Sequence, residues 1–104
     1  MPDEIYYDNS ATTRTREEAA KLVYEMLTEC YGNPSSLHRK GFEAQKRLDK
    51  AREQVALSLG CQSSEIYFTS GGTEADNIAI LGAARAQKRR GNRIVTTAFE
   101  HDAV

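Results

Sequence analysis

Two glycines followed by a threonine are the residues of this sequence whose types and spacing most clearly suggest chemistry. The stretch FTSGGTEADN, residues 68–77, passes from an apolar segment through Gly71, Gly72 and Thr73 into a segment with helical periodicity. The first amides of a helix have no partner within the helix, and the helix dipole adds positive potential there, so such a junction can hold an anion. Glycine lets a phosphate approach the backbone, and threonine adds a hydroxyl donor. The pattern is neither G-x-G-x-x-G nor a P-loop, which disfavours a dinucleotide or ATP site.

His101 is the second candidate for a functional residue. It follows RIVTT, residues 93–97, which we expect to form a strand, so it should lie at the same carboxyl edge of a sheet as Gly72 and Thr73. A histidine there can offer a flat ring and a titratable nitrogen to a ligand whose phosphate the glycine turn holds. Each feature alone also has an ordinary interpretation, namely a tight connection in which Thr73 caps against Asp76, and an exposed loop histidine. Their convergence favours a site for a phosphorylated aromatic cofactor.

The two cysteines do not suggest further chemistry. Cys30 and Cys61 have no C-x-x-C pairing and no histidine at metal-ligand spacing, and no G-x-S-x-G motif is present. We therefore predict no metal site, and we interpret both cysteines as ordinary unpaired thiols in a reducing compartment.

Length and charge exclude several classes of partner. The chain has 104 residues, with 14 basic and 15 acidic side chains, so it fits one small domain with a near-neutral charge. This balance gives no electrostatic signature of nucleic-acid or membrane binding. No apolar stretch reaches the ~18–20 residues that span a bilayer, and the first residues lack the pattern of a signal peptide. We expect a cytoplasmic protein.

Two amphipathic helices should precede the glycine turn. The first is predicted after a capping box of Thr15 with Glu18 and should end before Gly32. The second should begin at about His38 and end at Gly60. The apolar stripes that define them at helical spacing are Ala19, Leu22, Val23, Met26, Leu27 and Cys30 in the first, and Ala44, Leu48, Ala51, Val55 and Leu59 in the second.

The second part of the sequence is typical of a βαβ unit. EIYFTS (65–70) and RIVTT (93–97) read as buried parallel strands, with a helix of small apolar residues between them. The fold class is therefore α/β, with two helices in residues 1–62 and the start of a cofactor-binding domain in 63–104. A parallel sheet is normally covered on both faces, and this sequence lacks the elements to do so. We expect it to be the front portion of a larger protein.

Four blocks in order resemble the opening of a known family: YYDNSATT (6–13), YGNPSSLHRKG (31–41), IYFTSGGTEADNIAI (66–80) and TTAFEHDAV (96–104). They are similar to the amino-terminal portion of the cysteine desulfurases, pyridoxal-phosphate enzymes of the class V aminotransferase group with fold type I. The resemblance implies that Gly72 and Thr73 bind the cofactor phosphate. It implies that His101 stacks on the pyridine ring and acts as a catalytic acid or base.

The implied reaction removes sulfur from L-cysteine, giving alanine and an enzyme persulfide for iron–sulfur cluster or thio-cofactor synthesis. The implied partners are a second copy in a homodimer and a sulfur-acceptor or iron–sulfur scaffold protein. None of the five lysines matches the family's cofactor-binding lysine, and neither cysteine matches its nucleophile. We therefore expect these residues alone to be inactive. The alternatives are a portion of a selenocysteine lyase or a class V aminotransferase, or a non-catalytic split module.

Overall fold

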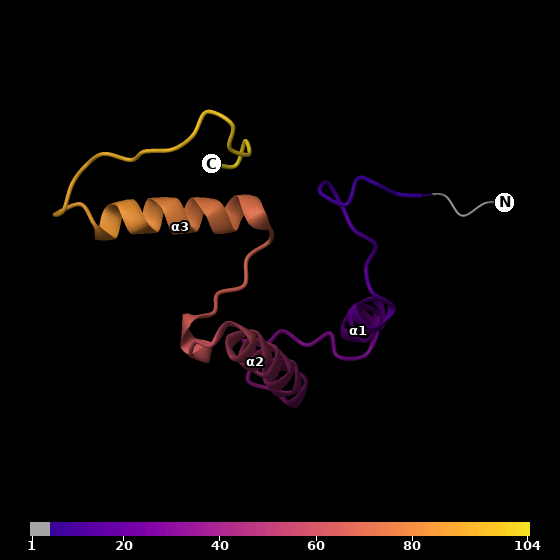
Figure 1. The fold of residues 1–104 in the computed structure, drawn as a ribbon. Helices are drawn as coiled ribbons and strands as arrows, with labels where there is room; N and C mark the ends of the chain where they lie inside the picture. The colour runs from indigo at the N-terminus through magenta and orange to yellow at the C-terminus, as the bar shows by residue number, and fades with distance from the viewer. Residues whose placement is uncertain (1–4) are drawn as a thin grey trace. The chain divides into compact units, whose positions relative to one another are not determined.

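The computed structural model describes residues 5–104, which form three α-helices and one short 3-10 helix. In chain order these are α1 (Glu17–Thr28), α2 (Arg39–Leu59), η1 (Ser63–Glu65) and α3 (Gly72–Ala86) (Figure 1). The chain divides into two compact units, one ending at Ser63 and the other spanning Ser64–Val104. The assignment of residues 1–62 and 63–104 to two parts of a larger enzyme stays a prediction. None of the helices within residues 5–104 has both the length and the apolar character of a membrane-spanning segment.

Helix α1 begins at Glu17, one residue later than a capping box of Thr15 with Glu18 requires. Arg16 has the extended conformation of a cap residue, and it makes no side-chain capping bond. The predicted pairing of Thr15 with Glu18 is therefore wrong. The first turn is stabilised instead by two acidic residues, Glu17 and Glu18, near the positive end of the helix dipole, and the Glu17 carboxylate lies 2.7 Å from the Lys21 ammonium.

Helix α2 begins and ends where the sequence predicts. His38 is its N-cap, and the His38 Nδ1 accepts a hydrogen bond of 3.2 Å from the Gly41 amide. At the other end Gly60 adopts the left-handed conformation, with φ 68°, and its amide donates to the carbonyl oxygens of Ala56 and Leu57. Both signals are local, since each depends on residues within one turn of the helix end.

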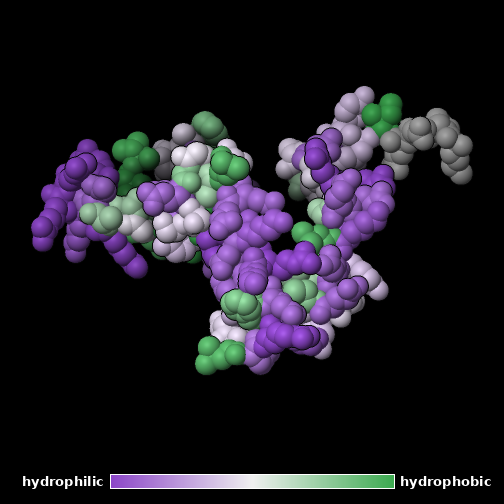
Figure 2. Space-filling view, turned by 90° about the horizontal axis from the view of Figure 1, so that it is seen from below, coloured by the Kyte–Doolittle hydropathy of each residue, from purple (hydrophilic) through white to green (hydrophobic). Residues whose placement is uncertain are grey.

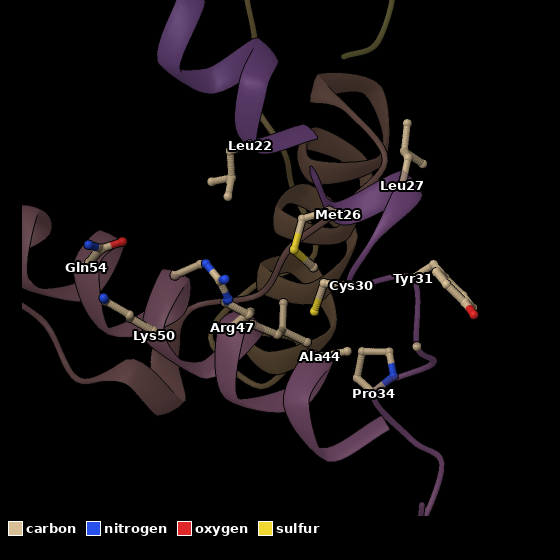
Figure 3. A pocket seen from close by; sticks show the side chains of 13 residues that line it. Leu22, Met26, Leu27, Cys30, Tyr31, Pro34, Ala44, Arg47, Lys50 and Gln54 are labelled. Carbon is tan, nitrogen blue, oxygen red and sulfur yellow. The ribbon is translucent and has the colours of Figure 1, made fainter. Parts of the chain in front are cut away.

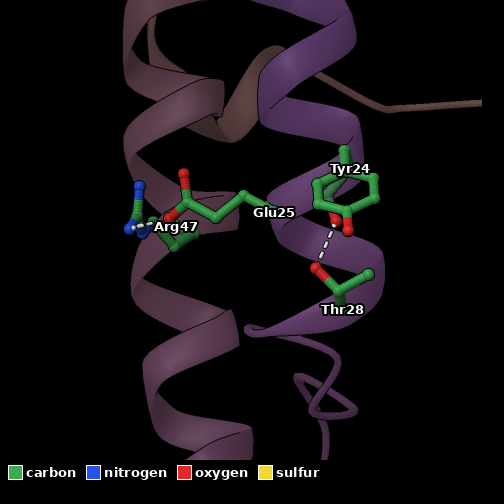
Figure 4. A network of polar contacts seen from close by, with 4 residues as sticks. All are labelled: Tyr24, Glu25, Thr28 and Arg47. Carbon is green, nitrogen blue, oxygen red and sulfur yellow. Dashed lines mark hydrogen bonds and ion pairs between the residues drawn. The ribbon is translucent and has the colours of Figure 1, made fainter.

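Helices α1 and α2 lie side by side in the first unit (Figure 4). The Arg47 Nη2 donates to the Glu25 Oε1 at 2.7 Å and joins the two helices. Ala44 and Ala56 are the buried apolar side chains of the described chain, at 2% and 3% exposure. Alanine buries little area, and the surface view shows many apolar side chains in contact with solvent (Figure 2).

Two glycines allow the turn before α2 to pack against that helix's backbone. A Cβ at Gly32 would lie 2.3 Å from the carbonyl oxygen of Lys40, and one at Gly41 would lie 2.3 Å from that of Ser36. Within the turn, Asn33 accepts from the Ser36 amide through its carbonyl at 2.9 Å. Any other residue at either glycine would collide with backbone, so these glycines are required by packing.

The second unit contains α3 and the segments on either side of it. Within the described residues no strand is present, so the predicted βαβ unit does not form in this structure. Glu65, the first residue of the expected strand 65–70, belongs to η1, and residues 93–97 return along α3 without strand pairing (Figure 1). A strand is stabilised by its neighbours and by cover on its faces, and two parallel strands alone supply little of either.

Candidate functional site

The glycine turn forms the start of α3, as the sequence predicts. Gly71 is the N-cap residue, and the first helical hydrogen bond runs from the Ala75 amide to the Gly71 carbonyl at 3.1 Å. The amides of Gly72, Thr73 and Glu74 therefore precede the helical ladder. Gly71, and not Thr73, holds the N-cap position, so the alternative interpretation of Thr73 as a cap is wrong. These amides can donate hydrogen bonds to a bound anion.

Neither Gly71 nor Gly72 is required by the fold of its own unit. A Cβ built on either residue meets no other atom within 4 Å. Gly71 has φ 167°, which is extended backbone that any residue adopts. The space beside the amides is therefore open, and a side chain added there would occupy the approach of a ligand rather than a packed contact.

Glu74 stabilises the turn that leads into α3 through hydrogen bonds with Ser70. Its Oε2 accepts from both the amide and the hydroxyl of Ser70, each at 2.7 Å. These bonds lower the pKa of Glu74, the backbone amide contributing most and the hydroxyl next. The carboxylate is thus engaged by Ser70, and the amides of the first turn of α3 stay open.

The turn that carries His101 lies against the first turn of α3. The Asn77 Nδ2 donates to the Thr73 carbonyl at 2.8 Å and to the Ala103 carbonyl at 3.1 Å. The His101 Nδ1 accepts from the Ala103 amide at 3.1 Å, and the ring is exposed. Its Nε2 has no partner among the described residues. The structure therefore brings the three predicted site residues to the same end of α3, although through a returning loop rather than the edge of a sheet.

Sequence reasoning missed Asn77 and Glu74. The spacing of Asn77 four residues after Thr73 indicates a contact along the helix. No sequence signal pairs Asn77 with Ala103, because this contact depends on how the chain returns. Glu74 follows Ser70 by four residues, and this spacing was the available signal.

A large cavity belongs to the first unit and contains none of these residues. It is a groove of about 610 Å³ between α1 and α2 (Figure 3). The thiol of Cys30 faces it, and the lining contains no histidine. No cluster of three metal-ligating residues occurs in residues 5–104. The walls of the groove between α1 and α2 are mostly apolar. The lining residues include the apolar Leu22, Met26, Leu27, Leu48 and Ala51 and the polar Arg47, Lys50 and Gln54.

A family comparison covers almost all of this chain. The sequence profile of the family described as "Aminotransferase class-V" matches residues 5–104. The chain belongs to the aminotransferase class-V family. The resemblance found in the four sequence blocks is thereby confirmed at the family level.

Relatives of this class-V chain are named as desulfurases. The cysteine desulfurase IscS of Clostridium botulinum is 46% identical over 104 residues, which is 100% of this chain and 26% of that protein. The cysteine desulfurase of Trichormus azollae is 50% identical over 100 residues, covering 96% of this chain and 25% of that protein. The chain thus spans about a quarter of the length of the relatives it matches.

A solved structure supports the same relationship. A NifS-like protein matches with a TM-score of 0.86 and 42% identity, over 95% of this chain and 27% of that one. The class-V chain therefore has the fold of a corresponding portion of a NifS-like protein.

Proposed function

We propose that this chain is the amino-terminal portion of a cysteine desulfurase and supplies part of its pyridoxal-phosphate site. The observation that carries the proposal is that the open amides of Gly72 and Thr73 and the turn of His101 meet at one end of α3. The desulfurase names of the relatives support the choice of reaction.

The residues at this end of α3 fit the chemistry of the cofactor. A phosphate needs several hydrogen-bond donors and close access to the backbone. The turn offers consecutive amides, the Thr73 hydroxyl, and two glycines at which even an added Cβ would meet no other atom within 4 Å. The exposed His101 ring, held through its Nδ1, can lie over a flat heterocycle. When bound, pyridoxal phosphate supplies an electron sink for reactions at the amino-acid substrate.

In the proposed reaction the C–S bond of L-cysteine breaks. A protein thiolate bonds to the substrate sulfur and becomes a persulfide. The Cβ of the substrate keeps the electron pair of the broken C–S bond and takes a proton, which gives alanine. His101 is proposed to hold or move a proton at its Nε2 beside the cofactor, while Gly72 and Thr73 fix the phosphate. No lysine of this chain matches the family's cofactor-binding lysine and neither cysteine matches its nucleophile, so we expect the 104-residue chain alone to be inactive.

The remaining expectations concern the whole enzyme. Residues 65–70 and 93–97 are proposed to pair there as parallel strands around α3, with 1–62 as the small-domain and interface part and 63–104 as the start of the cofactor-binding domain. We propose a cytoplasmic homodimer that passes sulfur to an acceptor or iron–sulfur scaffold protein. No nucleic-acid or membrane partner is proposed.

A chimera tests this function. In it, the 104 residues replace the matching portion of the Clostridium botulinum protein, and alanine formed from L-cysteine is measured in the presence of pyridoxal phosphate. We expect the chimera to form alanine, and Thr73→Ala to weaken cofactor binding. The matched control is Thr97→Ala, since Thr97 bonds locally to Glu100 at 2.7 Å. A folded chimera that binds no pyridoxal phosphate would contradict the proposal.

A further inference from the structure

The side chain of Asn77 lies between the two halves of the proposed cofactor site. We propose that Asn77 is a positioning residue that holds the His101 turn against the Gly72–Thr73 turn before any ligand binds. The consequence for the cofactor rests on the proposed function, whereas the linkage itself does not. Both hydrogen bonds of Asn77 go to backbone carbonyls, so it acts through the backbone of Thr73 and Ala103.

The geometry uses both hydrogens of one amide group. The Asn77 Nδ2 donates to the Thr73 carbonyl at 2.8 Å and, across 26 residues, to the Ala103 carbonyl at 3.1 Å. Both partners are acceptors, so the amide nitrogen and not the amide oxygen must face them. A carboxylate of the same shape could make neither bond.

Local hydrogen bonds join the residues of the turn beyond α3 to one another. The His101 Nδ1 accepts from the Ala103 amide at 3.1 Å, and the His101 carbonyl accepts from the Val104 amide at 2.9 Å. These bonds join His101 to its neighbours and not to α3. The bond to Asn77 therefore transmits the position of α3 to the whole turn, including the imidazole.

The competing explanation is that Asn77 acts only within the helix, through its bond to Thr73. A serine substitution at position 77 distinguishes this explanation from the proposed positioning role. Serine at position 77 can still donate to the carbonyl four residues earlier, as serine commonly does in helices. Its shorter side chain does not reach the Ala103 carbonyl. Asn77→Ser thus keeps the local bond to Thr73 and removes the long-range one, while Asn77→Ala removes both. Asn92→Ser makes the same chemical change in the turn beyond the other end of α3 and serves as the control.

The experiment has a ligand-free readout on the 104-residue chain and a ligand-bound readout on the chimera described above, which supplies the rest of the proposed cofactor site. Amide resonances of residues 101–104 are recorded by NMR without ligand. Dissociation constants for inorganic phosphate and for pyridoxal phosphate are then measured by calorimetry. For Asn77→Ser we expect shifted resonances, unchanged affinity for phosphate and about fivefold weaker binding of pyridoxal phosphate, the effect of one lost hydrogen bond. Loss of folding would weaken both ligands equally, so the ratio of the two affinities isolates positioning.

The outcomes separate this inference from the proposed function. If Asn77→Ser has wild-type resonances and a wild-type affinity ratio, the inference is overturned. If the chimera that carries the wild-type segment binds neither phosphate nor pyridoxal phosphate, the proposed function of this turn is overturned, and the ligand-free resonances alone decide the linkage. A matching shift in Asn92→Ser would also overturn it, because the effect would not be specific to Asn77.

Discussion

A Cβ at Gly41 would lie 2.3 Å from a backbone carbonyl of the first unit, whereas a Cβ at Gly72 in the second unit would meet no other atom within 4 Å. In the first unit, packing of a turn against α2 explains the glycine. In the second unit, the fold leaves Gly72 unexplained. The difference indicates that packing within its unit does not explain Gly72, and its place beside the unpaired amides at the start of α3 distinguishes it from the other unpacked glycines. The remaining predictions test this contrast.

Gly41→Ala should have the largest effect. The added methyl group must displace the Ser36 carbonyl, and we expect a loss of about 3 kcal/mol in the free energy of unfolding of the first unit. Thermal unfolding followed by circular dichroism measures it. Gly82→Ala is the matched control, because its Cβ meets no atom within 4 Å at an exposed helix position, and it should stabilise α3 by about 0.5–1 kcal/mol. Equal stability of Gly41→Ala and wild type would remove the first half of the comparison.

Gly72→Ala should show the opposite pattern. We expect its unfolding free energy to stay within about 0.5 kcal/mol of wild type, as for an unpacked surface position. Its affinity for pyridoxal phosphate should fall about tenfold, equivalent to about 1.4 kcal/mol, because the methyl group enters the phosphate approach. Calorimetry measures the affinity, with Gly82→Ala again as control. A destabilised variant with unchanged affinity would show that Gly72 is a packing glycine after all.

The ion pair between Glu25 and Arg47 should contribute less. Their side chains are 38% and 51% exposed, so solvent screens the pair despite its 2.7 Å separation. A double-mutant cycle of Glu25→Gln and Arg47→Gln should give a coupling energy below about 1 kcal/mol, and this should decrease with added salt. A salt-independent coupling well above that value would mean that the first unit is joined by charge rather than by its close backbone contacts.

The pH dependence of the second unit should be the smallest effect. The hydrogen bonds from Ser70 lower the pKa of Glu74 from its ordinary 4.5. The ionised Glu74 carboxylate therefore stabilises the folded second unit fully above pH 4.5, and this contribution is lost as the pH falls through the lowered pKa. An NMR titration of the Glu74 carboxyl group measures this. Ser70→Ala should raise the pKa of Glu74 only partly toward 4.5, because the larger contribution comes from the Ser70 amide, which the variant keeps. An identical titration in wild type and variant would exclude the hydroxyl as a cause.

The sequence predicted best those features that depend on near neighbours. The boundaries of α2 follow from His38 and Gly60, and the start of α3 follows from the glycine turn, because caps act within about one helical turn. The capping box at Thr15 was wrong by one residue, since Arg16 takes the cap position without a side-chain bond. The pairing of residues 65–70 with 93–97 was not found, because strands need partners that residues 64–104 do not provide in this structure.

Sequence patterns were enough to predict the three helices, the open amides at Gly72 and Thr73, and the class-V family. They also predicted that His101 lies near those amides, but the returning loop that brings it there and its connection through Asn77 were visible only in the folded chain. The two kinds of feature differ in how far apart the interacting residues lie in the sequence. A helix start is set by backbone geometry over a few residues, whereas a bond across 26 residues exists only once the chain beyond α3 has turned back along the helix.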